Sequence, residues 1–296
     1  MDDLRASRTA VLTCQGRAVA QGRFAPGRFD DPTAMVLLRA PEREAVEAAR
    51  SGTPPAGWSE RVQYEMLRAS GEVMAPRTVA IDDAVRANPT PQLVVLGAGL
   101  DGRAWRMPQL AGVDVLEVDH PASQRDKRDR LGDLPPTAGS VVFVAVDLTR
   151  DDLGAALAAG SAGRHRSAGA TTWIWEGVGP YLTPQEVRAT LSVLGSRSAP
   201  GSRLVVNYQS PSVAATAGRL VARAMSAVAR REDPVADEAR RSSWRPTAMA
   251  ALLAEHGFRA LSDDDLLTIA ADLGVAVRNR RSAGVGRVVV ADRWAE

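Results

Sequence analysis

The chain has 296 residues, of which 45% are hydrophobic and 24% charged, as expected of a soluble globular enzyme. Its 37 basic and 35 acidic residues give a formal net charge of +2, which is too small to indicate nucleic-acid binding. No run of about 18 apolar residues indicates a membrane span. A single cysteine, Cys14, excludes an internal disulfide and a cysteine-based metal cluster. We therefore expect a cytoplasmic protein without a bound metal.

In chain order, residues 1–75 show helical patterns and loops but no clear strand, which predicts an N-terminal helical cap. Strand and helix patterns alternate from residue 76 onward, so we expect 76–296 to form the core of one compact unit. Strands are expected at 92–97, 113–119, 140–147, 171–177, 203–209, 257–262 and 286–292. Helices are expected at 60–70, 77–87, 101–107, 121–131, 151–159, 184–195, 213–231, 246–256 and 263–272.

This alternation predicts an α/β fold with a doubly wound, Rossmann-like sheet and helices on both of its faces. Seven strands are expected, mostly parallel, with the last strand antiparallel. The helix expected at 213–231 carries one apolar stripe, which favours packing on the core and leaves a lid over the site as the alternative.

A glycine-rich turn directly follows the first expected strand. Glycines at this position let the backbone turn sharply and approach a ligand closely. Gly97, Gly99 and Gly102, with Ala98 between the first two, satisfy the dinucleotide pattern G-x-G-x-x-G. Asp119 ends the next strand, where an acid can bind ribose hydroxyls. Both a dinucleotide and S-adenosylmethionine contain such a ribose, so this segment alone leaves the two ligands open.

Other charged residues distinguish these two ligands. Asp147, followed by Leu148, ends the third strand and can accept a hydrogen bond from an adenine amino group. Glu176 ends the fourth strand, Asp101 follows the glycines, and Arg77 lies about one helix before the first strand. Parallel strands bring these groups to one sheet edge. An arginine for a carboxylate, with acids for an ammonium and a sulfonium, favours S-adenosylmethionine.

The segments RTVAIDD, LGAGLDGRAWR, LEVDHP, VAVDL and WEGVGPYL, with SRTA and FDDPTA near the N-terminus, match a known family in order and spacing. Together they resemble the S-adenosylmethionine-dependent methyltransferases of the leucine carboxyl methyltransferase-like family. That family includes bacterial O-methyltransferases, some of which tailor polyketides in secondary metabolism. The resemblance covers most of the chain and implies a methyltransferase sheet with S-adenosyl-L-methionine as cofactor.

The resemblance also implies roles for individual residues. Arg77 would bind the methionine carboxylate, and Glu176 would lie near the methionine amino group. Gly97 and Gly99 would pack against the methionine moiety, and Asp119 would bind the ribose hydroxyls.

Further residues are implied to bind the adenosine part of the cofactor, and two positions depart from the family pattern. The resemblance implies that Asp147 and Leu148 bind adenine, with His120 facing the adenosine side. Gly102 stands where threonine is common in the family, and 177–180, Gly-Val-Gly-Pro, replaces a bulkier apolar turn. The second departure affects the acceptor side.

The acceptor is expected to be the carboxylate of a small, polyketide-like acid, which gives a methyl ester. A carboxylate is ionised at neutral pH, and no histidine is placed as a base on the acceptor side. Tyr181 and Tyr208, at the ends of neighbouring strands, are the candidates that position the acceptor oxygen. A phenolic or enolic hydroxyl remains an alternative acceptor, as does a protein C-terminus, for which no docking surface is visible.

Two other functions remain open. An NAD(P)-dependent oxidoreductase would explain the glycines and Asp119, but the sole lysine, Lys127, has no tyrosine four residues before it. A non-catalytic adenosine-binding protein would retain the same ligand-binding residues. The sequence does not indicate the oligomeric state.

Overall fold

The computed structural model describes residues 7–161, 163–177, 181–211 and 241–294. Within them, seven strands form one sheet in the order β3-β2-β1-β4-β5-β7-β6. The first five strands run parallel, and β7 is antiparallel to both of its neighbours, as predicted. The strands are β1 (Gln92–Leu96), β2 (Asp114–Asp119), β3 (Ser140–Ala145), β4 (Thr171–Trp175), β5 (Arg203–Gln209), β6 (Phe258–Asp265) and β7 (Gly286–Arg293).

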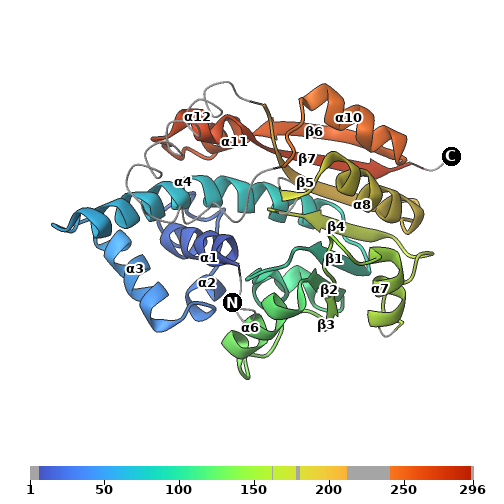
Figure 1. Ribbon diagram of the computed structural model, residues 1–296, viewed down its shortest axis with the longest axis horizontal. Helices are drawn as coiled ribbons and strands as arrows, with labels where there is room; N and C mark the ends of the chain where they lie inside the picture. The colour runs from blue at the N-terminus through green and yellow to red at the C-terminus, as the bar shows by residue number, and fades with distance from the viewer. Residues whose placement is uncertain (1–6, 162, 178–180, 212–240, 295–296) are drawn as a thin grey trace.

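Helices cover both faces of this sheet because side chains alternate along each buried strand (Figure 1). On β1, Leu93 and Val95 pack into one apolar cluster, whereas Val94 and Leu96 pack into another on the opposite face. The first face is covered by α4 (Trp58–Ala87), α5 (Arg103–Arg106) and α11 (Leu266–Asp272). The second is covered by α7 (Leu153–Gly160), α8 (Pro184–Ser196) and α10 (Pro246–Glu255).

The described N-terminal residues are helical, without a strand. They form α1 (Arg8–Ala20), α2 (Thr33–Val36) and α3 (Ala40–Ser51), which share a small apolar core with the first part of α4. The remaining elements are α6 (Pro121–Leu131), the short α12 (Arg280–Ala283) and a 3-10 turn, η1 (Pro108–Leu110). None of the helices in the described part of the chain combines the length and apolarity needed to cross a bilayer.

The helices expected at 60–70 and 77–87 are one continuous helix, α4, which passes through Pro76. A proline inside a helix removes one backbone donor and crowds the preceding turn. Here a single buried stripe, including Leu67, Gly71, Ala75 and Val79, continues across the proline. Packing along that stripe outweighs the local cost, so the expected cap–core boundary at residues 75 and 76 lies within a helix.

Two other differences concern element ends. The helix expected at 101–107 is only the single turn α5, and β6 extends to Asp265, so that α11 starts later than expected. The helix and the lid alternative expected at 213–231 lie outside the described residues.

Candidate functional site

A cavity of about 540 Å³ lies at the carboxyl ends of β1, β2 and β4, with α1 forming part of its wall. Its volume is in the range of small-molecule sites. The wall combines residues of the core with residues of the N-terminal helices. It is lined by Ser7, Thr9, Ala10, Thr13, Arg17, Arg77, Val95, Gly97, Ala98, Gly99, Leu100, Asp101, Asp119, His120, Ala122, Ser123, Thr149, Glu176, Gly177 and Tyr181.

The turn after β1 gives the cavity a wall of bare backbone. Gly97 and Gly99 have φ of 65° and 46°, in the left-handed region that favours glycine. The backbone N–H groups of Gly97 and Ala98 donate to the carbonyl of Val118 at 2.8 and 3.2 Å, which joins the turn to β2. A Cβ atom on Gly99 would lie 3.1 Å from the Cβ of Ala10 on α1, so a side chain there would crowd the cap. The structure therefore supports the predicted reason for glycine at both positions.

Asp119 lies at the carboxyl end of β2, and its carboxylate is part of the cavity wall. One carboxylate oxygen accepts from Gly99 N at 2.5 Å and the other from His120 N at 2.6 Å. Burial raises the pKa of Asp119, and the two N–H donors only partly oppose that change. A carboxylate oxygen has two lone pairs, so each can still accept a bond from a ligand hydroxyl.

His120 follows Asp119 as the N-cap of α6. Its Nδ1 accepts from Ala122 N at 3.2 Å, which leaves Nε2 to carry the proton of the neutral ring. The residue is exposed and lines the cavity beside Asp119.

A chain of buried charges forms another part of the cavity wall. Arg77 Nη2 lies 2.8 Å from one oxygen of Glu176, and Arg103 Nη1 lies 2.8 Å from the other. Arg103 also pairs with Asp101. The Nε of Arg77 is buried and has no hydrogen-bond acceptor among the described residues. Burial lowers the pKa of Arg77, whereas the negative charge of Glu176 raises it. The guanidinium stays charged at neutral pH.

These guanidinium groups keep two of the cavity carboxylates, Asp101 and Glu176, ionised. Burial disfavours the charge on Asp101, but Arg103 lies against it and lowers its pKa well below the ordinary range. Burial likewise disfavours the charge on Glu176, and Arg77 and Arg103 together lower its pKa. Both acids are therefore negative at neutral pH, as the predicted zwitterion site requires.

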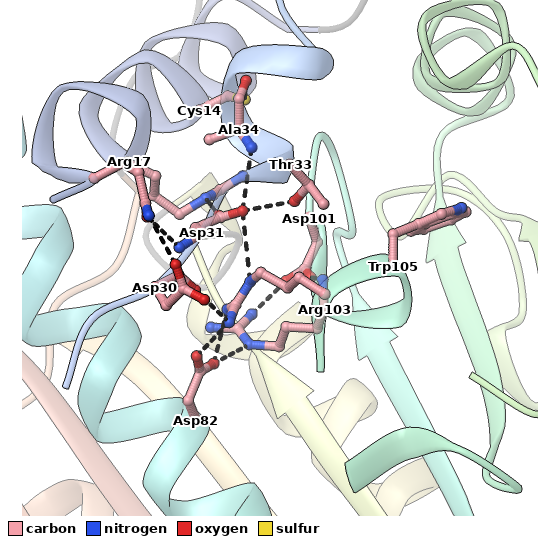
Figure 2. A network of polar contacts seen from close by, with 12 residues as sticks. Cys14, Arg17, Asp30, Asp31, Thr33, Ala34, Asp82, Asp101, Arg103 and Trp105 are labelled. Carbon is pink, nitrogen blue, oxygen red and sulfur yellow. Dashed lines mark hydrogen bonds and ion pairs between the residues drawn. The ribbon is translucent and has the colours of Figure 1, made fainter. Parts of the chain in front are cut away.

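The same charges connect the cap to the core (Figure 2). Arg17 Nε lies 2.7 Å from Asp31, whose other oxygen is 3.5 Å from Arg106 Nε. Arg106 and Arg103 both pair at 2.7 Å with Asp82 of α4. This network is buried and links α1, the segment before α2, α4 and α5. Its geometry fixes the position of the cap relative to the cavity.

Sequence reasoning missed Arg17, which lies in the cavity wall and donates through Nη2 to Leu100 O at 2.6 Å. One signal could have identified it. Arg17 lies on the helix face between Cys14 and Ala18, both fully buried, and an arginine on such a stripe needs an internal partner. The small hydroxyl residues Ser7, Thr9 and Thr13 were missed for lack of any comparable signal.

The structure does not place Asp147 and Leu148 in the cavity wall, where Thr149 lies instead. Strand β3 ends at Ala145, so Asp147 belongs to the following turn. Its carboxylate accepts from the backbone and hydroxyl of Thr149 at 3.0 and 2.6 Å, and Leu148 packs on an apolar cluster. Burial opposes the charge on Asp147, but the bonds from Thr149 lower its pKa.

The two candidate tyrosines are in different places. Tyr181 lines the cavity, with its hydroxyl 3.4 Å from that of Thr9 on α1. Tyr208 is buried outside the cavity, beneath α8 and α10, and donates to Asp263 at 2.6 Å. Burial and Asp263 raise the pKa of Tyr208 well above its ordinary value. The structure therefore brings Tyr181 to the site and keeps Tyr208 out of it.

The departure from the family at Gly102 has a local cause. A Cβ atom there would lie 1.9 Å from the hydroxyl oxygen of Thr33 on α2, which in turn bonds to Asp31 at 2.6 Å. Thr33 thus occupies the space that a side chain at position 102 would need. The other departure, at 177–180, is described only at Gly177, a cavity residue with φ of 74°.

Residues 10–195 match the family model described as leucine carboxyl methyltransferase. A protein of Mycobacterium sp. (strain JLS), provisionally named an S-adenosyl-L-methionine-dependent methyltransferase, is 36% identical over 204 residues. That match covers 68% of this chain and spans 65% of the relative's length. A protein of Mycolicibacterium vanbaalenii with the same provisional name is 37% identical over 210 residues, covering 67% of this chain and 66% of that one.

Two solved structures show the same fold. One, from Thermobifida fusca YX and provisionally described as a methyltransferase, has a TM-score of 0.59 at 14% identity, covering 99% of this chain and 96% of that one. The other, a DUF574 family protein from Streptomyces avermitilis, has a TM-score of 0.55 at 15% identity and covers 98% of both chains.

Proposed function

Because the chain belongs to the leucine carboxyl methyltransferase family, whose methyl donor is S-adenosyl-L-methionine, we propose that it methylates an oxygen atom of a small molecule. The acceptor in this proposal is a carboxylate, and the product is a methyl ester. The N-terminal region 1–75 acts as a cap on a cofactor-binding core formed by 76–296.

The cavity residues fit this cofactor. The unpartnered Nε of Arg77 is the observation that carries the proposal, because a buried donor without an acceptor is costly unless a ligand completes it. We assign it to the cofactor carboxylate. Asp119, which retains free lone pairs, is assigned to the ribose hydroxyls, and the bare backbone at 97–99 to the methionine moiety. Asp101 and Glu176 supply negative charge near the cationic groups.

The adenine end is assigned differently from the sequence-based expectation. Thr149 is the cavity residue nearest in sequence to Asp147 and Leu148, so the turn after β3 contributes to the adenine site through Thr149. His120 remains assigned to the adenosine side. Asp147 positions this turn without lining the cavity, since its carboxylate accepts hydrogen bonds from the backbone N–H and the hydroxyl of Thr149.

S-adenosyl-L-methionine supplies a methyl group on a positively charged sulfur and leaves as a neutral thioether. The protein therefore needs no acid for the leaving group. Its task is to hold the acceptor oxygen in line with the methyl carbon and to exclude water. Tyr181 and Thr9, whose hydroxyls lie 3.4 Å apart in the cavity wall, are assigned to the acceptor oxygen. The helix α1 excludes water on that side.

A carboxylate acceptor agrees with the charges in the cavity. With a pKa of about 4, it is ionised at neutral pH and needs no base. Two of the cavity carboxylates, Asp101 and Glu176, are poor bases for another acceptor, because they face guanidinium groups that lower their pKa values. Asp119, whose pKa is raised by burial, is assigned to the ribose instead. A hydroxyl acceptor is the second candidate, and the observation that favours it is the presence of His120 in the cavity wall.

The test is turnover on a panel of carboxylic acids and matched phenols, with the product analysed by mass spectrometry before and after mild alkali. We expect an alkali-labile ester whose rate of formation is nearly flat between about pH 6 and 8, above the carboxyl pKa. His120→Gln should leave that profile flat. An alkali-stable ether, formed at a rate that rises with pH and falls in His120→Gln, would replace the carboxylate with the hydroxyl acceptor.

A further inference from the structure

One buried ion pair lies beside the cavity without forming part of its described wall. Glu117 of β2 and Lys127 of α6 are each 1% exposed, and Glu117 Oε2 lies 2.5 Å from Lys127 Nζ. The other carboxylate oxygen, Oε1, is buried and has no hydrogen-bond partner among the described residues. Replacing such a pair by apolar side chains of similar size is often neutral or stabilising. Stability alone therefore does not account for an acid at position 117.

The register of the sheet places Glu117 next to the cavity. Its Cα is paired with that of Val95 on the neighbouring strand β1, and Val95 lines the cavity. Neighbouring strands lie about 4.8 Å apart. Asp119, which also lines the cavity, is two residues further along β2 on the same face, a step of about 7 Å. Glu117 therefore lies one layer beneath the wall that is assigned to the ribose and the methionine moiety.

The charged groups around Glu117 come from several elements. Lys127 of α6 contacts it directly, and Asp119 follows it on β2. Asp101 lies in the turn after β1, where it pairs with Arg103 of α5. Burial raises the pKa of Glu117 to about 7; Lys127 opposes this change, whereas the negative charges of Asp101 and Asp119 add to it. The carboxyl of Glu117 is therefore sensitive to charges in the cavity wall.

The other neighbours of Glu117 are aromatic. Trp105 of α5 lies with its ring centre 5.0 Å from Lys127 Nζ. Phe143 of β3 is the register partner of Glu117, and its ring centre is 6.4 Å from that of Trp105. Arg128 of α6 lies over the Phe143 ring at 4.4 Å. Aromatic rings do not solvate a charge as water does, so charges interact across this layer with little screening.

The charge of Glu117 therefore acts on ligands in the cavity. At an effective dielectric constant of about 20, two unit charges about 10 Å apart change an equilibrium constant roughly tenfold. An ionised Glu117 attracts a cation bound at the turn after β1, whereas a protonated Glu117 does not. S-adenosyl-L-methionine has such a cation at its sulfur. Its product, S-adenosylhomocysteine, has the same adenosine, carboxylate and ammonium groups but a neutral sulfur, so the two ligands differ in the charge that Glu117 senses.

The ionisation of Glu117 gives this discrimination a pH dependence. Below about pH 7 the carboxyl holds its proton, and it does not favour either ligand. Above that pH the carboxylate favours the ligand with the positive sulfur. Linkage requires the reverse effect as well: binding of that ligand lowers the pKa of Glu117, so a fraction of a proton leaves for the solvent. Binding of the neutral thioether releases less.

We propose that Glu117 is a specificity-determining residue through which the protein binds S-adenosyl-L-methionine in preference to its product S-adenosylhomocysteine, and that this preference increases as the pH rises through neutrality. Glu117 acts through its charge, from beneath the cavity wall, and contacts neither ligand. Inhibition by the product is accordingly weaker above neutral pH than below it. The proposal rests on the assignment of the cavity to the cofactor and is independent of the methyl acceptor.

Calorimetry on the full chain without an acceptor tests the proposal by measuring the dissociation constants of both ligands between about pH 6 and 8. The ratio of the constant for S-adenosylhomocysteine to that for S-adenosyl-L-methionine should rise at least threefold more in the wild type than in Glu117→Gln. The variant keeps a neutral side chain of the same shape at every pH. Asp119, His120 and the amino groups of the ligands titrate in both proteins, so the difference isolates Glu117. Glu255→Gln, at an exposed carboxylate, is the control and should follow the wild type.

A second measurement counts the protons released. Binding enthalpies near pH 7 in two buffers of different ionisation enthalpy give the protons released with each ligand. The excess released with S-adenosyl-L-methionine over S-adenosylhomocysteine should be smaller in Glu117→Gln than in the wild type. Melting temperatures will show whether the variant is folded. If it is not, the double variant Glu117→Gln/Lys127→Met takes its place, because it leaves no buried ammonium without a partner.

The outcomes separate this proposal from the cofactor assignment. If both ligands bind and the ratio of their dissociation constants follows the same pH curve with and without Glu117, the proposal is wrong and the cofactor assignment stands. If neither ligand binds the wild type at any pH, the cofactor assignment is wrong and the proposal fails with it.

Discussion

Two buried groups of charges lie near the cavity, and they respond differently to burial. In the network around Arg103, each guanidinium contacts several carboxylates, and the pKa values of Asp101 and Glu176 fall. Beneath Asp119 on the same strand, Glu117 has a single partner, Lys127 at 2.5 Å, and its pKa rises to about 7. A planar guanidinium can satisfy several carboxylates at once, whereas an ammonium acts as a point charge.

The partner of Glu117, Lys127, is the only lysine among the 37 basic residues of the chain. Lys127 is 1% exposed, and its ammonium lies 5.0 Å from the centre of the Trp105 ring. The compact ammonium lies between the ring and the carboxylate. One oxygen of Glu117 nevertheless has no hydrogen-bond partner among the described residues. The pair therefore offsets the desolvation cost of its buried charges less completely than the network does.

Removing the arginine shared by the network should have the largest effect. Arg103→Met leaves Asp82, Asp101 and Glu176 with fewer counter-charges in a buried site, and should lower the free energy of unfolding by about 3–5 kcal/mol. Urea denaturation will measure it. The control, Arg28→Met, removes an ion pair exposed to solvent and should cost less than about 1 kcal/mol. Equal losses in the two variants would contradict the account of the network.

The pH dependence of stability should separate the two groups of charges. Because the pKa of Glu117 is raised from 4.5 to about 7, the folded state binds its proton more tightly than the unfolded state. Stability should therefore fall as the pH rises between these values, by roughly 3 kcal/mol from this group. The carboxylates of the network, whose pKa values are lowered, add no slope there, since their contribution is lost only on further acidification.

Glu117→Gln should remove the part of the slope that Glu117 supplies, while the slope from Asp119, whose pKa burial also raises, should remain. Unfolding free energies measured by urea denaturation across this pH range will show the change. Glu255→Gln, which alters a half-exposed carboxylate, is the control and should keep the slope of the wild type. If Glu117→Gln keeps the wild-type slope as well, Glu117 does not titrate in this range.

A substitution that disturbs packing at Gly102 should have the smallest effect on stability. Gly102→Ala places a methyl group against Thr33 and should cost about 1–3 kcal/mol, as overpacking does. Adding Thr33→Ala removes the hydroxyl but leaves the Cβ of residue 33 at 3.1 Å and Asp31 Oδ1 at 3.3 Å from the new Cβ, so recovery should be partial. A double-mutant cycle measured by thermal denaturation will give the coupling. Additive effects of the two substitutions would mean that residues 33 and 102 do not compete for space.

Local patterns in the sequence were sufficient to predict most of the sheet and the glycine turn. Apolar runs located all seven strands, and the acid at the end of β2, Asp119, lies in the cavity as predicted. Strand alternation could also have excluded Tyr208, because it shares a face with Leu204 and Val206, which pack beneath α8 and α10. Asp147 lies in a turn and outside the cavity wall because β3 ends two residues earlier than predicted, and its assignment to adenine stays a prediction.

The network could not be predicted from the sequence, because its members come from five separated segments and each is an ordinary charged residue by itself. Arg17 and Asp82 are 65 positions apart in the printed numbering, and only the packing of α1 on α4 brings them into one network. The same packing carries α4 through Pro76, which local propensity predicts as a break. Both are consequences of tertiary contacts.

The central claim is that Arg77 binds the amino-acid end of the cofactor and Asp119 the ribose end. Calorimetry can compare S-adenosylhomocysteine with 5′-methylthioadenosine, which has the ribose but no amino-acid end. Arg77→Met should weaken the binding of S-adenosylhomocysteine by about 1.5–3 kcal/mol and leave the binding of methylthioadenosine unchanged. Asp119→Ala should weaken the binding of both ligands. Equal loss of both ligands in Arg77→Met, or tight binding of NAD in place of S-adenosylhomocysteine, would contradict this account.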